Sequence, residues 1–393
     1  MHFMKDTIIT DVQVYVGNNK KPKDNPGKKY DTSWATESVI ANPLSGYPEF
    51  YPRRSSWFGM TGGAFVVIKT NRGVEGYGMT TGDHASAAVI RHHYRKLLIG
   101  RSPYQIEQIW DILFRASLPY GRKGVAIMAL SAVDLALWDC VAKLREEPLY
   151  VSLGGAVRES IPAYVTGNDF SETREINYVG QKLAMPYGPA SGVDGMKKNV
   201  ELVKYAREQL GNEREIMLDC YMGWNVEYTI RMAQLLEPYR VKWIEESLPP
   251  DDYAGYAELN RKITSTAIAT GEHEFTRFGF QQLLDVNGAA IVQPDIYWCG
   301  GLTEAKKICA MASAKHIPVI PHGGGAQAWT IHLLFAEPGI PWAEYFLGAG
   351  MNDPIFTCAF DRVPDDGKLS LPEGIGSGLT LREDAYELLA EVL

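Results

Sequence analysis

Residues 215–245, EIMLDCYMGWNVEYTIRMAQLLEPYRVKWIE, have the pattern of one strand–helix–strand unit of a parallel sheet. A short apolar run ends at Asp219, a segment of helix length follows, and a second apolar run ends at Glu245. Parallel strands need a crossover of a dozen or more residues, and this interval leaves room for a helix and two loops. The stretch therefore predicts two parallel strands that each end on a carboxylate.

The same rhythm continues toward the C-terminus. Four more apolar runs end on residues that can hold a metal ion or move a proton: IATGE at Glu272, AIVQPD at Asp295, PVIPH at His322 and WAE at Glu344. With strands expected at 161–166 and 181–186, the count reaches eight, and helices are expected at 194–210, 226–238, 252–263, 276–286, 303–315 and 326–336. The fold class is therefore α/β, a (β/α)8 TIM-type barrel, and in such barrels every strand ends at the face that holds the active site.

The sequence before the barrel has a different pattern. Residues 7–16 and 63–69 are rich in β-branched side chains, and NRG at 71–73 predicts a hairpin with the segment after it. Residues 84–150 are helical in pattern, and the polar stretch 17–60 is expected to be a lid or disordered. We expect an α+β domain at 1–158, the barrel at 159–350, and a segment at 351–393 that ends in a helix at 381–393 and packs back on the first domain.

Composition narrows the class of protein. The 393 residues exceed one average domain, and 46% hydrophobic with 22% charged residues is an ordinary globular mixture. A net charge of −8 argues against nucleic acid as a partner, because nucleic acid is bound by basic patches. Five scattered cysteines without CxxC spacing favour free thiols over a structural zinc site. No apolar run of membrane-spanning length and no secretory signal are recognised, so a soluble cytoplasmic protein is expected.

Asp219, Glu245 and Glu272 are candidate metal ligands. Three carboxylates at one barrel mouth repel one another and raise each other's pKa, which a hard dication would relieve. Mg²⁺ prefers oxygen ligands, whereas the missing thiolates and the missing two-His-one-carboxylate set argue against zinc and non-haem iron. The alternative is that they are ordinary strand-end acids, which is less favoured for three on successive strands. Glu246 is expected to point outward or to support the site, because strand side chains alternate in direction.

Asp295 and His322 are candidate partners in proton transfer. An aspartate beside an imidazole fixes its tautomer and raises its basicity. The sequence has no nucleophile in an elbow-type motif, so His322 is expected to be a proton shuttle. Glu344, if it is protonated, could donate a hydrogen bond to a developing oxyanion. The direction of His273 stays open, because it follows Glu272 at the strand end.

Several stretches carry a family resemblance: ALSAVDLALWD, LGGAVR, AMPYGP, MLDCYM, KWIEESLPP, TGEHEF, IVQPDIYWCGGLT and VIPHG. Over nearly the whole chain the sequence resembles the enolase superfamily, in its mandelate-racemase-like subgroup, and most closely the L-rhamnonate dehydratases. The resemblance implies an enolase-like fold, with an α+β capping domain from both termini over the barrel, a Mg²⁺ cofactor, an acid-sugar substrate and a homo-oligomer.

The resemblance also implies roles for single residues. Asp219, Glu245 and Glu272 match the magnesium ligands, His322 matches the general base and Asp295 its partner. Glu344 matches the residue that stabilises the intermediate, and His273 matches a histidine that faces substrate. Arg54 matches a capping-domain arginine that contacts substrate, with Arg53 as the less favoured choice.

Two positions depart from patterns in the relatives. Many relatives have a Lys-x-Lys motif at the end of the second strand, whereas Ala184 stands at the position of its second lysine here. Rhamnonate dehydratases also lack the lysine pair, so this agrees with the resemblance. This argues against a two-base racemase. Rhamnonate dehydratases also have a histidine before the lid tryptophan, whereas Ser33 precedes Trp34 here. Serine does not titrate near neutral pH, so we expect the distal end of the sugar to be recognised differently here.

The expected reaction is dehydration of an aldonic acid to a 2-keto-3-deoxy acid. His322 would remove the C2 proton and, once protonated, assist departure of the 3-hydroxyl on the same face. L-Rhamnonate is the first candidate substrate, and L-lyxonate and L-mannonate are its competitors. The alternatives are a racemase, epimerase or cycloisomerase of the same superfamily, and a sugar-acid binding protein without catalysis.

Overall fold

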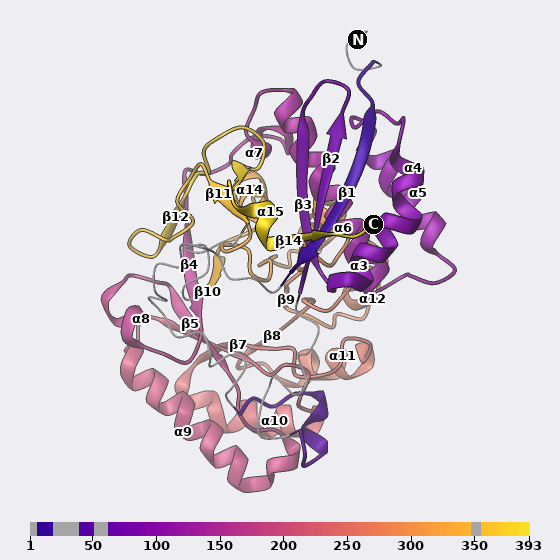
Figure 1. Cartoon of the computed structure of the whole chain (residues 1–393). Coiled ribbons are helices and arrows are strands. Elements are labelled where there is room, and N and C mark those ends of the chain that lie inside the picture. Colours follow the sequence, from indigo (N-terminus) through magenta and orange to yellow (C-terminus); the bar gives the residue numbers. More distant parts are fainter. Residues whose placement is uncertain (1–5, 19–38, 51–61, 347–354) are drawn as a thin grey trace.

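The computed structural model describes residues 6–18, 39–50, 62–346 and 355–393. It consists of an antiparallel sheet with helices, which forms the capping domain, and a parallel sheet surrounded by helices, which forms the barrel (Figure 1). The fold is therefore α/β, with a TIM-type barrel and an α+β capping domain, as the sequence predicts. The expected lid residues Ser33, Trp34, Arg53 and Arg54 lie outside the described residues.

The capping sheet has the strand order β14–β1–β2–β3 and is antiparallel throughout. Its strands are β1 (Ile9–Gly17), β2 (Gly63–Thr70), β3 (Glu75–Thr81) and β14 (Leu389–Glu391). The predicted hairpin of β2 and β3 is confirmed. Helical segments follow in chain order: α3 (Asp83–Val89), the π-helical turn η3 (Ile90–Tyr94), α4 (Arg95–Leu98), α5 (Ile106–Ser117), α6 (Val125–Leu144) and α7 (Leu149–Ser152).

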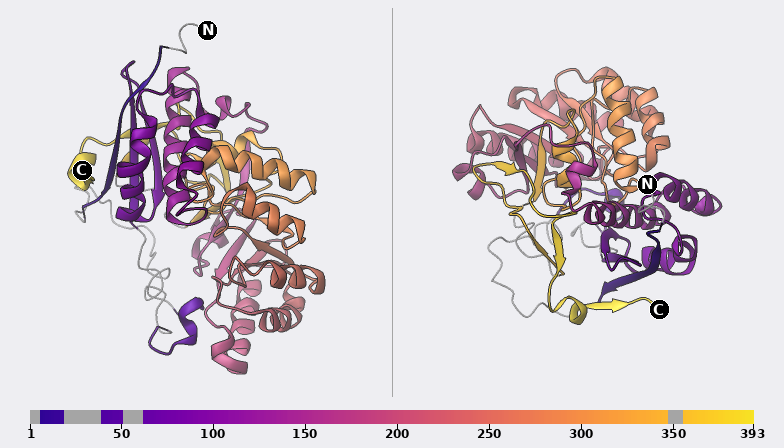
Figure 2. Two further views of the ribbon diagram at one scale, coloured as in Figure 1. Left: turned by 90° about the vertical axis from the view of Figure 1, so that its right-hand side faces the viewer. Right: turned by 90° about the horizontal axis from the view of Figure 1, so that it is seen from above.

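Helix α6 is the core helix of the capping domain and packs between the sheet and the barrel helix α13 (Figure 2, left). The close approach needs glycine in β3, since a Cβ on Gly78 would lie 2.0 Å from the Ala132 carbonyl oxygen. The expectation that no segment reaches membrane-spanning length is wrong for α6, which has that length and hydropathy. However, 83% of the most apolar 18-residue stretch of α6 is buried inside the protein, as is usual for the core helix of a soluble protein.

The barrel strands lie in the order β10–β4–β5–β6–β7–β8–β9 and their pairing is parallel. They are β4 (Ser160–Thr166), β5 (Gly180–Ala184), β6 (Glu215–Asp219), β7 (Val241–Glu245), β8 (Ala267–Thr270), β9 (Ile291–Val292) and β10 (Ala343–Phe346). The strand predicted at PVIPH is reduced to a single bridge between Val319 and Val292. The prolines at 318 and 321 cannot donate ladder hydrogen bonds, which explains the short pairing.

Six barrel helices lie close to the predicted ranges: α9 (Gly192–Leu210), α10 (Val226–Leu236), α11 (Tyr253–Lys262), α12 (Thr276–Asp285), α13 (Gly301–Ala314) and α14 (Thr330–Ala336). Shorter elements are η1 (Pro43–Gly46), α8 (Ser171–Glu175), η4 (Pro189–Ser191) and η5 (Glu237–Tyr239). Inside the barrel, below the strand ends, an apolar cluster fills the floor: Tyr164, Met217, Trp243, Ala269, Ile291 and Ile320.

The helix predicted at 381–393 is wrong. The C-terminal segment instead contains β11 (Phe356–Cys358), β12 (Lys368–Ser370), β13 (Leu379–Leu381), the short helix α15 (Ala385–Leu388) and strand β14. The last residues pair with β1 and cover its open edge, where unpaired backbone groups favour strand addition over a helix (Figure 1). We propose 158 and 350 as domain boundaries, since α7 ends at Ser152 and β4 begins at Ser160.

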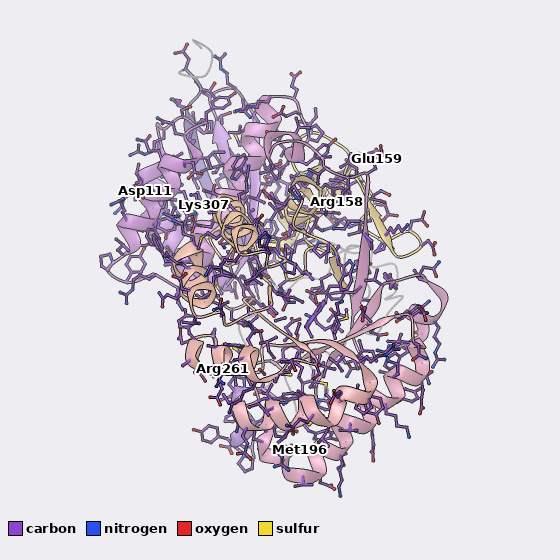
Figure 3. All side chains as sticks on the ribbon, turned by 180° about the vertical axis from the view of Figure 1, so that it is seen from behind. Asp111, Arg158, Glu159, Met196, Arg261 and Lys307 are labelled. Atoms are coloured by element: carbon purple, nitrogen blue, oxygen red, sulfur yellow. The ribbon has the colours of Figure 1, made fainter. Side chains whose placement is uncertain are left out.

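The capping domain and the barrel are joined on the side of α5 and α13. Lys307 on α13, labelled in Figure 3, reaches the capping domain, and its Nζ lies 2.7 Å from Glu107 Oε2 on α5. A cavity of about 730 Å³ runs along this junction between Gln105, Trp138 and Lys306, and one of about 830 Å³ lies between Tyr120 and Phe278. Neither cavity is lined by the candidate catalytic residues.

Candidate active site

Three predicted ligands come together at the barrel mouth. Asp219 and Glu245 end β6 and β7, and Glu272 follows β8 by two residues. One carboxylate oxygen of each residue lies within 4.8 Å of the others, and all three side chains are buried. Buried oxygen donors that converge from three strands are the set that suits Mg²⁺, so the residues present fit this ion. Burial raises the pKa of Glu245, which Lys182 only partly offsets, so the cluster would gain from a dication.

Lys182 in β5 is a member of the site that the sequence pattern did not reveal. Its Nζ lies 2.5 Å from Glu245 Oε1, 2.7 Å from Glu344 Oε1 and 3.6 Å from Asp219 Oδ2. Burial lowers the pKa of Lys182, but the charges of Glu245 and Glu344 raise it well above its ordinary value. A lysine inside a fully buried strand needs charged partners, and that was the available signal.

Glu344 is placed differently from expectation. It is the second residue of β10, not its end, and its two oxygens accept hydrogen bonds from three donors. Thr166 Oγ1 donates at 2.5 Å and Lys182 Nζ at 2.7 Å to Oε1, and the Gly323 N–H donates at 2.8 Å to Oε2. Burial raises the pKa of Glu344, but Lys182 and His322 lower it to about 2. The donors around Glu344 favour its carboxylate form in this structure, and hydrogen-bond donation by a protonated Glu344 stays a prediction.

Asp295 and His322 form a hydrogen-bonded pair. His322 Nδ1 lies 2.7 Å from Asp295 Oδ2, and since a carboxylate only accepts, Nδ1 carries the proton. The other ring nitrogen, Nε2, faces the carboxylate cluster and lies 3.4 Å from Glu272 Oε1. Burial lowers the pKa of His322, but Glu272, Asp295 and Glu344 raise it to about 10.

His273 and Glu246 form a second pair of the same kind. His273 Nδ1 lies 2.6 Å from Glu246 Oε2, the His273 N–H donates to Glu246 Oε1 at 3.1 Å, and Nε2 is 4.0 Å from Glu272 Oε1. Burial lowers the pKa of His273, but Glu246 and Glu272 raise it to about 9. Glu246 has a φ of 40°, so strand alternation stops at the end of β7 and both neighbouring glutamates turn inward. The question of direction that the sequence left open for His273 is thus answered: its ring faces the site.

Aromatic side chains enclose the two imidazoles. The ring of Trp298 lies 4.9 Å from the His273 ring and 6.0 Å from the His322 ring, measured between centroids. Phe346, at the end of β10, lies edge-on to His322 at 5.6 Å. Ala184, at the end of β5, is buried and provides no base opposite His322. Among the residues that the structure describes, the acid–base groups beside the carboxylates are therefore the two histidine pairs and Lys182.

Comparison with known proteins agrees with this geometry. Residues 179–385 match the family described as enolase C-terminal domain-like, and residues 49–154 match the N-terminal domain of mandelate racemase / muconate lactonizing enzyme. An L-rhamnonate dehydratase from Saccharopolyspora erythraea is 39% identical over 352 residues, which cover 88% of this chain and 90% of the relative.

Solved structures show the same fold. The rhamnonate dehydratase from Gibberella zeae complexed with Mg superposes with a TM-score of 0.92 and 32% identity, over 100% of this chain and 98% of that chain. The 3,6-anhydro-D-galactonate cycloisomerase from Zobellia galactanivorans superposes with a TM-score of 0.78 and 25% identity, over 98% of this chain and 99% of that chain. From the two matched domains and the likeness along the whole chain, the protein belongs to the enolase superfamily, in its mandelate racemase / muconate lactonizing enzyme family.

Proposed function

We propose that the protein is a Mg²⁺-dependent acid-sugar dehydratase, a hydro-lyase that converts an aldonic acid to a 2-keto-3-deoxy acid. The observation that carries the proposal is the His322–Asp295 pair, whose free Nε2 lies 3.4 Å from Glu272 of the carboxylate cluster. The rhamnonate dehydratases among the relatives support L-rhamnonate as the first substrate to test. L-Lyxonate and L-mannonate share its configuration around the reacting carbons and are the competitors.

Asp219, Glu245 and Glu272 would hold Mg²⁺, which supplies a Lewis acid for the substrate carboxylate and for the charge that develops on it. Lys182 adds a fixed positive charge at the same place, and Glu344 keeps that lysine charged and in position. Charge that is positioned before the reaction costs no reorganisation during it. We propose this support of the Lys182 charge as the role of Glu344, in place of the hydrogen-bond donation that the sequence suggested.

His322 removes the C2 proton through Nε2 while Asp295 holds the proton on Nδ1. The electron pair of the broken C2–H bond forms a double bond between C2 and C3 as the C3–O bond breaks. The protonated His322 gives its proton to the departing 3-hydroxyl, which leaves as water. The enol that results ketonises to the 2-keto-3-deoxy acid. For His322 to act as a base its pKa must fall, and a dication at Glu272 offsets the largest contribution that raises it.

A cycloisomerase, racemase or epimerase is the second candidate, because a solved cycloisomerase shares the fold at 25% identity. The described site argues against an isomerase that uses a second-strand lysine as its second base, since Ala184 offers no base and Lys182 is enclosed by three carboxylates. A binding protein without catalysis is the third candidate, and the two intact histidine pairs argue against it.

The test is incubation with Mg²⁺ and a panel of aldonic acids in D₂O, followed by assay of 2-keto acid. Keto product supports the dehydratase, exchange of the C2 hydrogen without product supports an isomerase, and binding without either supports the binding protein. His322→Asn should abolish dehydration and retain Mg²⁺ binding, whereas the exposed His84→Asn should behave like the wild type. Turnover by His322→Asn would overturn the assignment of the base.

We also propose a small-molecule enzyme of the cytoplasm that forms a homo-oligomer and has neither a nucleic-acid partner nor a membrane partner. Its five cysteines are free thiols in the structure, and four of them are buried, which suits a reducing compartment. Size-exclusion chromatography with light scattering tests the oligomer directly.

A further inference from the structure

The loop that follows Asp295 is held by the capping domain as well as by the barrel. Thr80 Oγ1 of β3 donates to the Tyr297 carbonyl at 2.7 Å. Trp110 Nε1 of α5 donates to the Gly300 carbonyl at 2.8 Å, and Ser131 Oγ of α6 accepts from the Gly300 N–H at 2.9 Å. Three capping-domain elements therefore fix the backbone on both sides of Trp298.

The start of α13 extends this contact. Asp134 accepts the Thr303 N–H at 3.0 Å, and Trp138 Nε1 donates to Thr303 Oγ1 at 2.9 Å. Gly301 has a φ of +78°, and a Cβ there would lie 2.3 Å from Asp134 Oδ2. Gly301, the second glycine of the WCGGLT stretch, is thus required by the docking of the two domains.

Trp298 lies in this loop, and its side chain contacts both the capping domain and the active site. Its ring lies against both imidazoles, at 4.9 Å from His273 and 6.0 Å from His322, and packs with Ile127 of α6 and with Phe275. The indole Nε1 is buried and has no hydrogen-bond partner among the residues that the structure describes. An unpaired buried N–H costs free energy that a phenylalanine would not, so packing alone does not account for a tryptophan here.

We propose that Trp298 is a positioning residue for the proposed reaction: held in place by the capping domain, its ring sets the planes of His273 and His322. The Nδ1 hydrogen bonds to Glu246 and Asp295 fix one edge of each imidazole, and Trp298 restricts rotation about that edge. Docking of the capping domain thereby determines the acid–base geometry of the barrel. The kinetic part rests on the dehydratase function proposed above, whereas the ring positions do not.

The test compares Trp298→Leu and Trp298→Phe with the matched control Trp329→Leu. Trp329 is also buried, but it donates to the Tyr77 carbonyl and packs on Tyr297 and Phe356 rather than on either imidazole. Because small misplacement of a reacting group can cost about 100-fold in rate, Trp298→Leu should lower kcat by about 10- to 100-fold with KM and Mg²⁺ affinity nearly unchanged. Trp298→Phe should keep kcat within about threefold of the wild type, since a ring still restricts the imidazoles. Trp329→Leu should lower Tm without lowering kcat.

Unchanged kcat in Trp298→Leu, or an equal loss of kcat in Trp329→Leu, would overturn the proposal. If Trp298→Leu does not fold, Thr80→Val decides, because it keeps Trp298 and removes one hydrogen bond that holds its loop. A lower kcat at constant KM supports the proposal, and unchanged kcat refutes it.

If the wild type acts on no sugar acid, the proposed function fails, but the proposed position of the two rings can still be tested. The side-chain ¹⁵N spectra of His273 and His322 then decide: shifts in Trp298→Leu that are absent in Trp329→Leu support the positioning role, and identical spectra reject it.

Discussion

Lys182 stands among three carboxylates in the barrel mouth, and its charge is part of how the site folds without a bound cation. Its ammonium group contacts Glu245 and Glu344 directly and lies near Asp219. Removing one partner of a buried ion pair leaves uncompensated charge, which is strongly destabilising. Lysine and Mg²⁺ therefore compensate overlapping negative charge, and their effects on stability should depend on each other.

Lys182→Met should lower the free energy of unfolding by about 3 kcal/mol in EDTA, because the carboxylates lose their buried counter-charge. Mg²⁺ should restore part of this loss, since it binds the same carboxylates. Urea unfolding in EDTA and in Mg²⁺ measures both effects. Lys143→Met is the control, because it also removes a partner of a buried aspartate, Asp139, but lies far from the ligands. An equal loss for Lys182→Met with and without Mg²⁺ would show that the two charges are not coupled.

Glu246 holds His273 by two hydrogen bonds, and this pair repeats the arrangement of Asp295 and His322. In Glu246→Gln the amide group would point a donor at Nδ1, so the ring would lose its orientation or change its tautomer. Loss of such a supporting carboxylate typically costs about 10- to 100-fold in activity. We expect kcat on the active sugar acid to fall by about tenfold, with Asp295→Asn more severe because it supports the base. If Glu246→Gln has the same kcat and KM as the wild type, the orientation of His273 does not matter for the reaction.

At the residue scale, the sequence predicted spatial proximity where a general rule applied. The convergence of the three candidate ligands and the contact of Asp295 with His322 could be predicted because parallel strands end at one face. For Glu246 the sequence left an outward or a supporting role open; its left-handed φ of 40° breaks the strand alternation, and its contact with His273 agrees with the supporting role. Glu344 was expected at a strand end, but β10 continues to Phe346, and its neighbours Lys182 and Thr166 come from other strands.

At the scale of elements, the barrel helices were predictable because a strand and a helix recur at nearly constant spacing. The segment at PVIPH and the C-terminal helix were not, for different reasons. The prolines at 318 and 321 limit strand pairing beside β9. Residues 389–391 form a strand because they pair with the edge of β1, which lies about 370 residues earlier in the chain. Sequence periodicity reports local structure, and a distant strand edge can override it.

Asp134 of α6 caps the start of α13 and gives a prediction for that contact. It is buried, and burial raises its pKa to about 7, although hydrogen bonds from Thr303 lower it. Its folded-state pKa thus lies above its unfolded value of 3.8, so its contribution to stability is present at low pH and is lost as pH rises toward 7.

Asp134→Asn keeps an oxygen for the Thr303 N–H and removes the charge. The variant should be more stable than the wild type at pH 8, by roughly 3 kcal/mol, and the difference should shrink at pH 5. Urea unfolding at the two pH values measures this. A variant that is less stable than the wild type at pH 8 would mean that the carboxylate is needed in its charged form.

At the scale of the whole molecule, the active site depends on contacts that join distant parts of the chain. Residues 9–17 and 389–391 share one sheet, and that domain holds the loop after Asp295 through Thr80, Trp110 and Ser131. The sequence indicated a capping domain, but no local pattern predicts how two domains dock. The predicted substrate contacts Ser33, Trp34 and Arg54 lie outside the described residues, so their part in the choice of sugar acid stays a prediction.

His332 of α14 links the C-terminal segment and α7 to the barrel, and it makes folding of the whole chain sensitive to acid. Its ring is buried between Tyr150 and Phe360, and its Nδ1 accepts the Tyr150 N–H at 3.2 Å. Burial lowers its pKa from 6.5 to about 4. Between these values the unfolded chain binds a proton that the folded protein does not. The contribution of His332 to stability is therefore complete above pH 6.5 and is lost as pH falls toward 4.

His332→Asn keeps an acceptor for Tyr150 and cannot be protonated, so its free energy of unfolding should fall less steeply with acid between pH 6.5 and 4. The slope should differ from that of the wild type by up to about 1.4 kcal/mol per pH unit. Urea unfolding at several pH values measures the slopes, which are unaffected by the constant loss from the smaller side chain. The raised pKa values of His273 and His322 affect stability above pH 6.5, so they do not disturb this window. Exposed His84→Asn should keep the wild-type slope, and if His332→Asn keeps it as well, the acid sensitivity arises elsewhere in the molecule.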